Sequence, residues 1–192
     1  MIKSRKKSLL PIRFCRGSDM LRTDDGNWYA LFVVTGEEDN VKERLKYRLK
    51  DRFRLLVPKR RLKERRDGVW RPRIRTLFPG YVLMNGTIDT EAYYLMKGVP
   101  GLLRLLRSGF EPFRIEREEM AVINRLICNS ETIGYSSVLV ENGRVIVVDG
   151  PLVSLEGQII RINHRKGRAE VRLNFMGEPR TVELGINVLQ PA

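Results

Sequence analysis

Clustered cations are the residues of this sequence best suited to chemistry, and phosphate binding is the chemistry they favour. A histidine, two arginines and a lysine lie within residues 164–168, and two more arginines flank them. Lysine and arginine side chains neutralise phosphates, and arginine also donates paired hydrogen bonds to the edge of guanine. The cluster therefore predicts a nucleic-acid-binding site composed of His164, Arg165, Lys166, Arg168, Arg161 and Arg172. A solvated turn that binds no ligand is the alternative interpretation.

A second basic segment runs from Lys59 to Arg75 and contains a turn signal at Asp67-Gly68. This pattern predicts an extended hairpin or loop that projects from a sheet. Its cations are expected to contact phosphates, and its tryptophan is expected to stack on an exposed base. The residues concerned are Arg60, Arg61, Lys63, Arg65, Arg66 and Trp70. A charged loop that simply faces solvent is the alternative.

The charge of the whole chain indicates the same class of partner. The 192 residues include 36 Lys and Arg against 23 Asp and Glu, which gives a formal net charge of +13. Most of the excess lies in residues 27–115, whose net charge is +10, whereas residues 138–192 carry only +1. Such a surplus suggests a polyanionic partner, although it does not identify one.

None of the standard catalytic motifs is assembled in this sequence. It has no phosphate-binding loop, no dinucleotide-binding turn, no zinc-protease motif and no nucleophile elbow. His164, the single histidine, lies in a basic turn without an acidic neighbour to orient it. Cys15 and Cys128 are far apart, so they supply neither a zinc ligand set nor a disulfide framework. The sequence therefore predicts a binding protein that is not an enzyme and needs no metal or cofactor.

No segment of the sequence is apolar enough to span a membrane or to serve as a signal peptide, so a cytoplasmic protein is expected. Residues 1–26 are basic and lack periodicity, which predicts a disordered tail. The native start is either Met1 or Met20, because residues 16–19 could be encoded by the purine-rich codons of a ribosome-binding site.

Residues 27–129 alternate between strand and helix patterns. An aromatic and β-branched run predicts a strand at 28–34, and apolar residues at spacing four predict a helix between Val41 and Phe53. Thr35 and Glu38 form a predicted capping box at the start of this helix. Strands are also expected at 53–57, 77–84 and 102–106, and helices at 90–97 and 116–129. This order predicts a ferredoxin-like α/β sandwich with one added helix.

Residues 130–139 show little periodicity and are expected to form a linker. Beyond them, residues 140–192 contain only short strand signals separated by turns, which predicts a small five-stranded barrel of about 50 residues. The fold class is therefore α+β, with an N-terminal sandwich joined by a linker to a β-barrel.

Several motifs resemble those of the NusG family of transcription elongation and antitermination factors, in which the second domain is a KOW domain. They are Phe78-Pro79-Gly80-Tyr81-Val82-Leu83, Gly98-Val99-Pro100-Gly101 and Asp149-Gly150-Pro151-Leu152. The resemblance implies that the first domain binds the clamp helices of RNA polymerase beside the upstream DNA fork, at the bacterial nucleoid. Phe78 and Tyr81 match the family's docking motif, and Trp28 lies on the neighbouring strand. The alternative is that these aromatic residues belong to the core.

The KOW domain departs from the housekeeping pattern of this family. Leu152 and Leu155 stand where the family has two phenylalanines, Phe175 begins a changed later loop, and the hairpin tip at 164–168 is basic. These changes resemble the specialised LoaP paralogues and, more distantly, RfaH. They imply a monomeric antitermination factor whose KOW domain binds a structured hairpin of nascent leader RNA.

Two alternatives stay open. One is a general NusG-type factor whose KOW domain binds a ribosomal or termination protein through Leu152, Leu155 and Phe175. The other is an RNA-binding protein of the ribosome that never binds polymerase. A stable barrel is expected rather than one that refolds into helices, because the strands are rich in β-branched residues.

Overall fold

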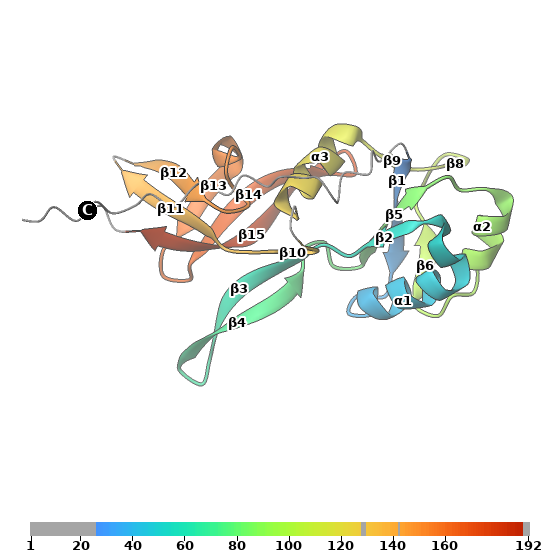
Figure 1. Cartoon of the computed structure of the whole chain (residues 1–192), viewed down its shortest axis with the longest axis horizontal. Coiled ribbons are helices and arrows are strands. Elements are labelled where there is room, and N and C mark those ends of the chain that lie inside the picture. The colour runs from blue at the N-terminus through green and yellow to red at the C-terminus, as the bar shows by residue number, and fades with distance from the viewer. Residues whose placement is uncertain (1–25, 128–129, 142, 190–192) are drawn as a thin grey trace, which may run out of the picture.

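The computed structural model describes residues 26–127, 130–141 and 143–189, and Figure 1 shows two sheets joined through a helix. The predicted tail, apart from Gly26, lies outside the described residues, as do Cys15, Cys128 and both candidate start methionines. The predicted fold class is confirmed, since an N-terminal α/β domain precedes a C-terminal curled sheet of five strands.

The N-terminal sheet has the strand order β2-β5-β1-β6, which is that of a ferredoxin-like fold. These strands are β1 (Asn27–Val33), β2 (Arg54–Leu56), β5 (Tyr81–Gly86) and β6 (Leu102–Leu105), and all neighbours are antiparallel. The short β9 (Arg114–Ile115) also pairs with β1. A small hairpin of β7 (Arg107–Ser108) and β8 (Glu111–Pro112), which the sequence patterns did not predict, follows β6.

Three helices cover this sheet on opposite faces. Helices α1 (Glu38–Leu49) and α2 (Thr90–Met96) pack on Tyr29, Leu31 and Val33 of β1. The alternate residues of the same strand, Trp28 and Ala30, pack with α3 (Arg117–Leu126). Because successive strand residues face opposite sides of a sheet, β1 is buried on both faces. A short 3₁₀ turn, η1 (Lys50–Arg52), separates α1 from β2.

The predicted capping box at Thr35 is wrong, and the structure gives Glu38 a different role. Helix α1 has Glu37 at its N-cap position without a side-chain cap. The buried Glu38 carboxylate instead accepts hydrogen bonds from the backbone N–H of Gly36 at 3.0 Å and of Gly80 at 2.7 Å. Gly80 has a positive φ of 83°, so residues 77–80 form a turn where a strand was predicted. Glu38 therefore fixes the turn that carries Phe78.

The predicted projecting hairpin is present as β3 (Lys59–Arg66) and β4 (Val69–Thr76). Its turn residues, Asp67 and Gly68, both have positive φ, as a tight two-residue hairpin turn requires. β10 (Thr132–Ile133) pairs in parallel with β3. The segment expected to be a linker thus contributes a strand to the hairpin sheet.

The C-terminal domain is a curled sheet with the order β12-β11-β15-β14-β13. Its strands are β11 (Ser136–Glu141), β12 (Arg144–Asp149), β13 (Ile159–Asn163), β14 (Arg168–Phe175) and β15 (Glu178–Leu189). A 3₁₀ turn, η2 (Glu156–Gln158), precedes β13. Strand β15 runs through the centre of the sheet, because it pairs with both β11 and β14.

A single apolar cluster connects the two domains. It includes Trp28 and Phe78 from the N-terminal domain, Ile123 from α3, and Leu173 and Phe175 from β14. The described structure is therefore a closed arrangement in which the C-terminal sheet packs on α3 and on the outer face of the N-terminal sheet.

Replacing Glu38 with alanine is expected to lower the free energy of unfolding by about 2 kcal/mol, because two backbone N–H groups lose a charged acceptor. Glu43→Ala is the matched control, since Glu43 is exposed on the same helix. Urea denaturation followed by circular dichroism measures both variants. Equal stabilities would show that the Glu38 hydrogen bonds do not hold the turn.

Candidate binding surfaces

The three aromatic residues predicted to dock on a partner, Trp28, Phe78 and Tyr81, are called the docking aromatics below, and they do not lie on a free surface. Trp28 and Phe78 are only 5% and 6% exposed, and Tyr81 is half-buried. The ring of Phe175 stacks on Phe78, with centroids 4.0 Å apart and planes within 4°. Tyr81 meets the same Phe175 ring edge-on, with centroids 5.4 Å apart. One phenylalanine of the C-terminal domain therefore covers two of the three docking aromatics.

Helix α3 adds a polar contact beside this aromatic stack. The Glu119 carboxylate accepts hydrogen bonds from the backbone N–H of Met176 at 3.0 Å and of Gly177 at 2.9 Å. These two residues form the turn between β14 and β15, and Glu119 is buried. Hydrogen bonds to an ionised acceptor are stronger than neutral ones, so Glu119 holds the turn against the N-terminal domain.

The residues predicted to bind a protein partner are also covered. Leu152, Leu155 and Phe175 are all buried in the apolar cluster that extends through both domains, and Phe175 contacts Phe78 and Tyr81 of the N-terminal domain. Sequence patterns did not reveal this arrangement, because the contact joins Phe175 to Phe78, nearly one hundred residues earlier in the chain.

The predicted phosphate-binding cations of the β3–β4 hairpin divide into two groups. Arg61, Arg65 and Arg66 are exposed, as is Trp70 with 41% of its surface accessible. Lys63 is half-buried, where its Nζ donates to Asn187 Oδ1 at 2.9 Å and lies over the Tyr135 ring.

Arg60 points into the junction between the domains and donates to the backbone carbonyl of Glu183 at 2.8 Å. Burial, ahead of the neighbouring charges, lowers the pKa of its guanidinium. In this closed arrangement Arg60 therefore serves as a contact between the domains.

Two arginines of β4 were missed by sequence reasoning. Arg71 and Arg73 are exposed, and they lie opposite Glu64 and Leu62 in the strand pairing. The alternation of arginine at 71, 73 and 75 was the signal that could have found them, since alternate strand residues share a face. Arg75 pairs with Glu64 at 2.8 Å. This hydrogen bond is the main cause that lowers the pKa of the Glu64 carboxyl, with further contributions from the charges of Arg168 and Arg73.

The basic tip of the C-terminal domain is mostly accessible. His164, Arg165 and Lys166 are exposed in the turn between β13 and β14, and Asn163 Oδ1 accepts the backbone N–H of Lys166 at 3.0 Å. Arg161 and Arg172 are exposed on the flanking strands.

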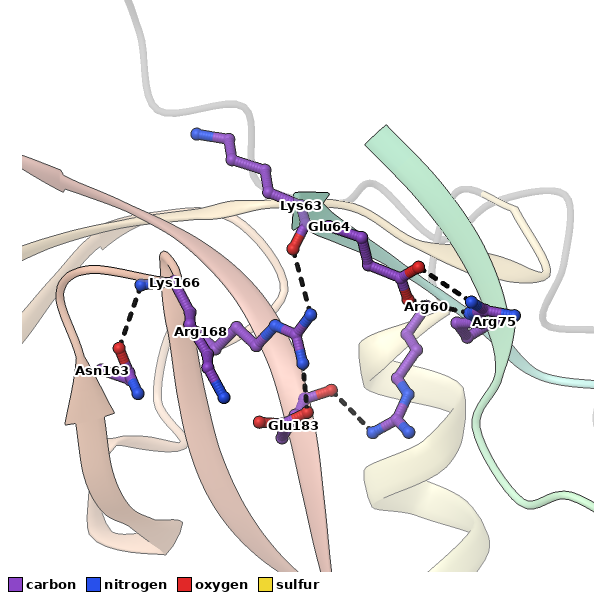
Figure 2. Close-up of polar contacts among 8 residues, drawn as sticks. All are labelled: Arg60, Lys63, Glu64, Arg75, Asn163, Lys166, Arg168 and Glu183. Carbon is purple, nitrogen blue, oxygen red and sulfur yellow. Dashed lines mark hydrogen bonds and ion pairs between the residues drawn. The ribbon is translucent and has the colours of Figure 1, made fainter. Parts of the chain in front are cut away.

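Arg168 differs from the rest of the predicted set. Its guanidinium pairs with Glu183 at 2.6 Å and donates to the backbone carbonyl of Lys63 at 3.0 Å, as Figure 2 shows. Only 14% of its side chain is exposed. The structure thus brings the tip and the hairpin together and uses Arg168 as their connection.

Among the described residues, no group of three or more His, Cys, Asp and Glu side chains is arranged to hold a metal ion. No described helix is both long and apolar enough to cross a membrane.

Comparison with known proteins gives consistent matches. The family model described as "Transcription termination factor nusG" matches residues 26–124. Relatives named transcription termination/antitermination protein NusG include that of Thermus thermophilus, 28% identical over 172 residues, covering 82% of this chain and 94% of the relative. The Haemophilus influenzae protein of the same name is 30% identical over 165 residues, covering 82% of this chain and 89% of the relative.

A solved structure, described as "Domain interaction in Thermotoga maritima NusG", aligns with a TM-score of 0.56 at 25% identity. The alignment covers 83% of this chain and 93% of that one. The matched region includes both domains, and that structure is described by an interaction between domains.

Replacing Glu119 with alanine is expected to weaken the closed arrangement by about 2 kcal/mol, because Met176 and Gly177 lose a charged acceptor. Small-angle X-ray scattering should then give a larger radius of gyration than for the unmodified chain. Glu118→Ala removes the same charge from the exposed neighbouring position and should leave the radius unchanged. An unchanged radius for the Glu119 variant would contradict its role at the domain contact.

Proposed function

This chain belongs to the NusG family of transcription termination and antitermination factors, and from that premise we propose that it acts on transcribing RNA polymerase as a general NusG-type elongation factor. Its family consists of regulators that are not enzymes. The observation that carries the proposal is the family match over residues 26–124, which contains all three docking aromatics. In this proposal Trp28, Phe78 and Tyr81 bind the clamp helices of the polymerase. The protein then acts as a monomer in the bacterial cytoplasm, at the nucleoid.

The closed arrangement makes polymerase binding conditional on opening. Phe175 covers Phe78 and Tyr81, so the clamp helices and the C-terminal domain compete for one aromatic surface. Opening would also release Phe175, beside Leu152 and Leu155, for a ribosomal or termination protein. The domain interaction named for the Thermotoga maritima protein supports a contact of this kind in a relative. The proposed cycle therefore exposes the polymerase surface and the protein-partner surface in one step.

The β3–β4 hairpin would lie beside the upstream DNA fork when the aromatics bind the clamp helices. Its exposed arginines, Arg61, Arg65 and Arg66, would then contact phosphates, and Trp70 would stack on an unpaired base.

Binding to core RNA polymerase tests the docking surface. Phe78→Ala combined with Tyr81→Ala is expected to weaken binding about thirtyfold, because aromatic anchors of an interface contribute about 2 kcal/mol or more. Glu119→Ala should strengthen binding, since it favours the open chain. Tyr47→Ala removes an aromatic ring that is 87% exposed on α1 and should have no effect. Equal affinities for the folded double variant and the unmodified chain would refute the docking surface.

A second function is favoured by the exposure of the tip. His164, Arg165 and Lys166 are accessible on one narrow turn, with Arg161 and Arg172 beside them. In the specialised, LoaP-like version of the proposal, this tip binds a structured hairpin in the nascent leader RNA. The bulges and loops of such a hairpin open a groove that regular A-form helices keep narrow.

Titration of the full chain with leader RNA hairpins and matched DNA duplexes tests this second function. Specific binding should survive moderate salt and be lost in the Arg165→Ala, Lys166→Ala double variant. Arg117→Ala combined with Arg125→Ala removes the same charge from exposed positions of α3 and should keep most of the affinity. Weak binding that does not depend on RNA sequence and falls steeply with salt would show that the tip binds phosphates only through the release of counterions.

A further inference from the structure

Two basic hairpins meet where β3 crosses the outer face of β14 and β15. Gly185 permits this crossing, since a Cβ there would clash with the Arg61 carbonyl oxygen and lie 2.5 Å from Cδ1 of Tyr135. A Cβ built on Gly167, in the tip turn, would lie 3.8 Å from Cδ of Lys63. Arg168, the residue after Gly167, donates to the backbone carbonyl of Lys63 at 3.0 Å, so strand β3 is in direct contact with the base of the tip.

The crossing brings two guanidinium groups to one acidic residue, Glu183. Arg168 and Arg60 converge on Glu183, the first through its carboxylate and the second through its backbone carbonyl (Figure 2). Burial is the main cause that lowers the pKa of Arg60; the Glu183 carboxylate raises it and the charge of Arg168 lowers it, so the two guanidinium groups repel each other while Glu183 attracts both. Closing the domains thus concentrates cations, which a polyanion would stabilise.

We propose that this crossing, which we term the junction site, is one binding site for a single-stranded phosphodiester chain, assembled from both domains. The hairpin supplies Arg61, Lys63 and Arg65, which alternate along β3 and share one of its faces, and the tip supplies Arg165 and Lys166. The inference rests on the proposed nucleic-acid roles of the two hairpins, and it adds that they act together in the closed chain.

The composition of the junction site favours a single strand over a duplex. Trp70 and His164 are exposed on the two hairpins and offer flat surfaces on which unpaired bases stack. A flexible strand can follow two crossing hairpins, whereas the bases of a duplex are already stacked on one another.

This assembly links strand binding to domain closure. A strand that spans both hairpins stabilises the closed chain, and the closed chain covers the docking aromatics. Because coupling between two binding events is reciprocal, a strand that bridges both hairpins and RNA polymerase each weaken the binding of the other, whereas nucleic acid held by one hairpin alone does not oppose polymerase.

Fluorescence anisotropy of the full chain with labelled oligonucleotides of about eight nucleotides tests the junction site. One oligonucleotide should bind per chain. Arg61→Ala with Arg65→Ala, and separately Arg165→Ala with Lys166→Ala, should each lower the affinity about tenfold and reduce the salt slope by about 1.4. RNA and DNA of the same sequence are compared. A preference for either one supports the site and identifies which of the two nucleic acids it binds.

The Gly185→Ala variant tests the effect of domain closure on strand binding without removing any charge. The substitution adds one methyl group that collides with Arg61 and Tyr135, so it should separate the hairpins and lower strand affinity as much as either charge pair. Near-ultraviolet circular dichroism confirms that each domain stays folded. Arg117→Ala with Arg125→Ala serves again as the charge-matched control.

Two results would overturn the inference while leaving the hairpins as separate nucleic-acid sites: two oligonucleotides bound per chain, or full affinity in the folded Gly185 variant. Tighter binding of a duplex than of either single strand would also overturn it. Binding by no nucleic acid at all would instead refute the proposed roles of both hairpins.

Discussion

The stack of Phe175 on Phe78 is the interaction on which the arrangement of the two domains depends. Each ring is held by its own domain, Phe78 on the turn fixed by Glu38 and Phe175 at the end of β14. If the two domains separated, the rings of Phe78 and Phe175 would both become exposed to water. Together they close one apolar cluster that extends from the N-terminal sheet to the C-terminal sheet.

Strand β15 extends this local contact along the whole junction. The turn that precedes it binds Glu119, while Glu183 and Gly185 in its middle meet Arg60 and Arg61 of the hairpin. Because β15 is hydrogen-bonded on both sides, to β11 and β14, it moves as part of a rigid sheet. The aromatic contact and the basic junction are therefore expected to form and separate together.

Opposing forces meet at this junction. Apolar burial, the hydrogen bonds that Glu119 accepts and the bond from Arg60 to the Glu183 carbonyl favour closure, whereas the burial of Arg60 and its proximity to Arg168 oppose it. Because apolar groups and cations lie at the same junction, the balance between the closed and open chain depends on partners of two kinds, an apolar protein surface and a polyanion. The aromatic surface and the basic surface are therefore both controlled by the same closing of the domains.

Sequence patterns predicted most of the strands and helices, the projecting hairpin and the family, because periodicity and turn chemistry act between residues close in the chain. The sequence also located the cations, but the structure alone decided that Arg60 and Arg168 face the junction while Arg71 and Arg73 face solvent. The predicted Thr35 cap is absent because the helix has Glu37 at its N-cap position, and the Glu38 carboxylate accepts a hydrogen bond from Gly80, 42 residues away. Likewise, Arg60 and Arg168 contact backbone carbonyls 123 and 105 residues distant. Only tertiary packing brings such groups together, since the orientation of each side chain depends on the surface that the other domain places against it.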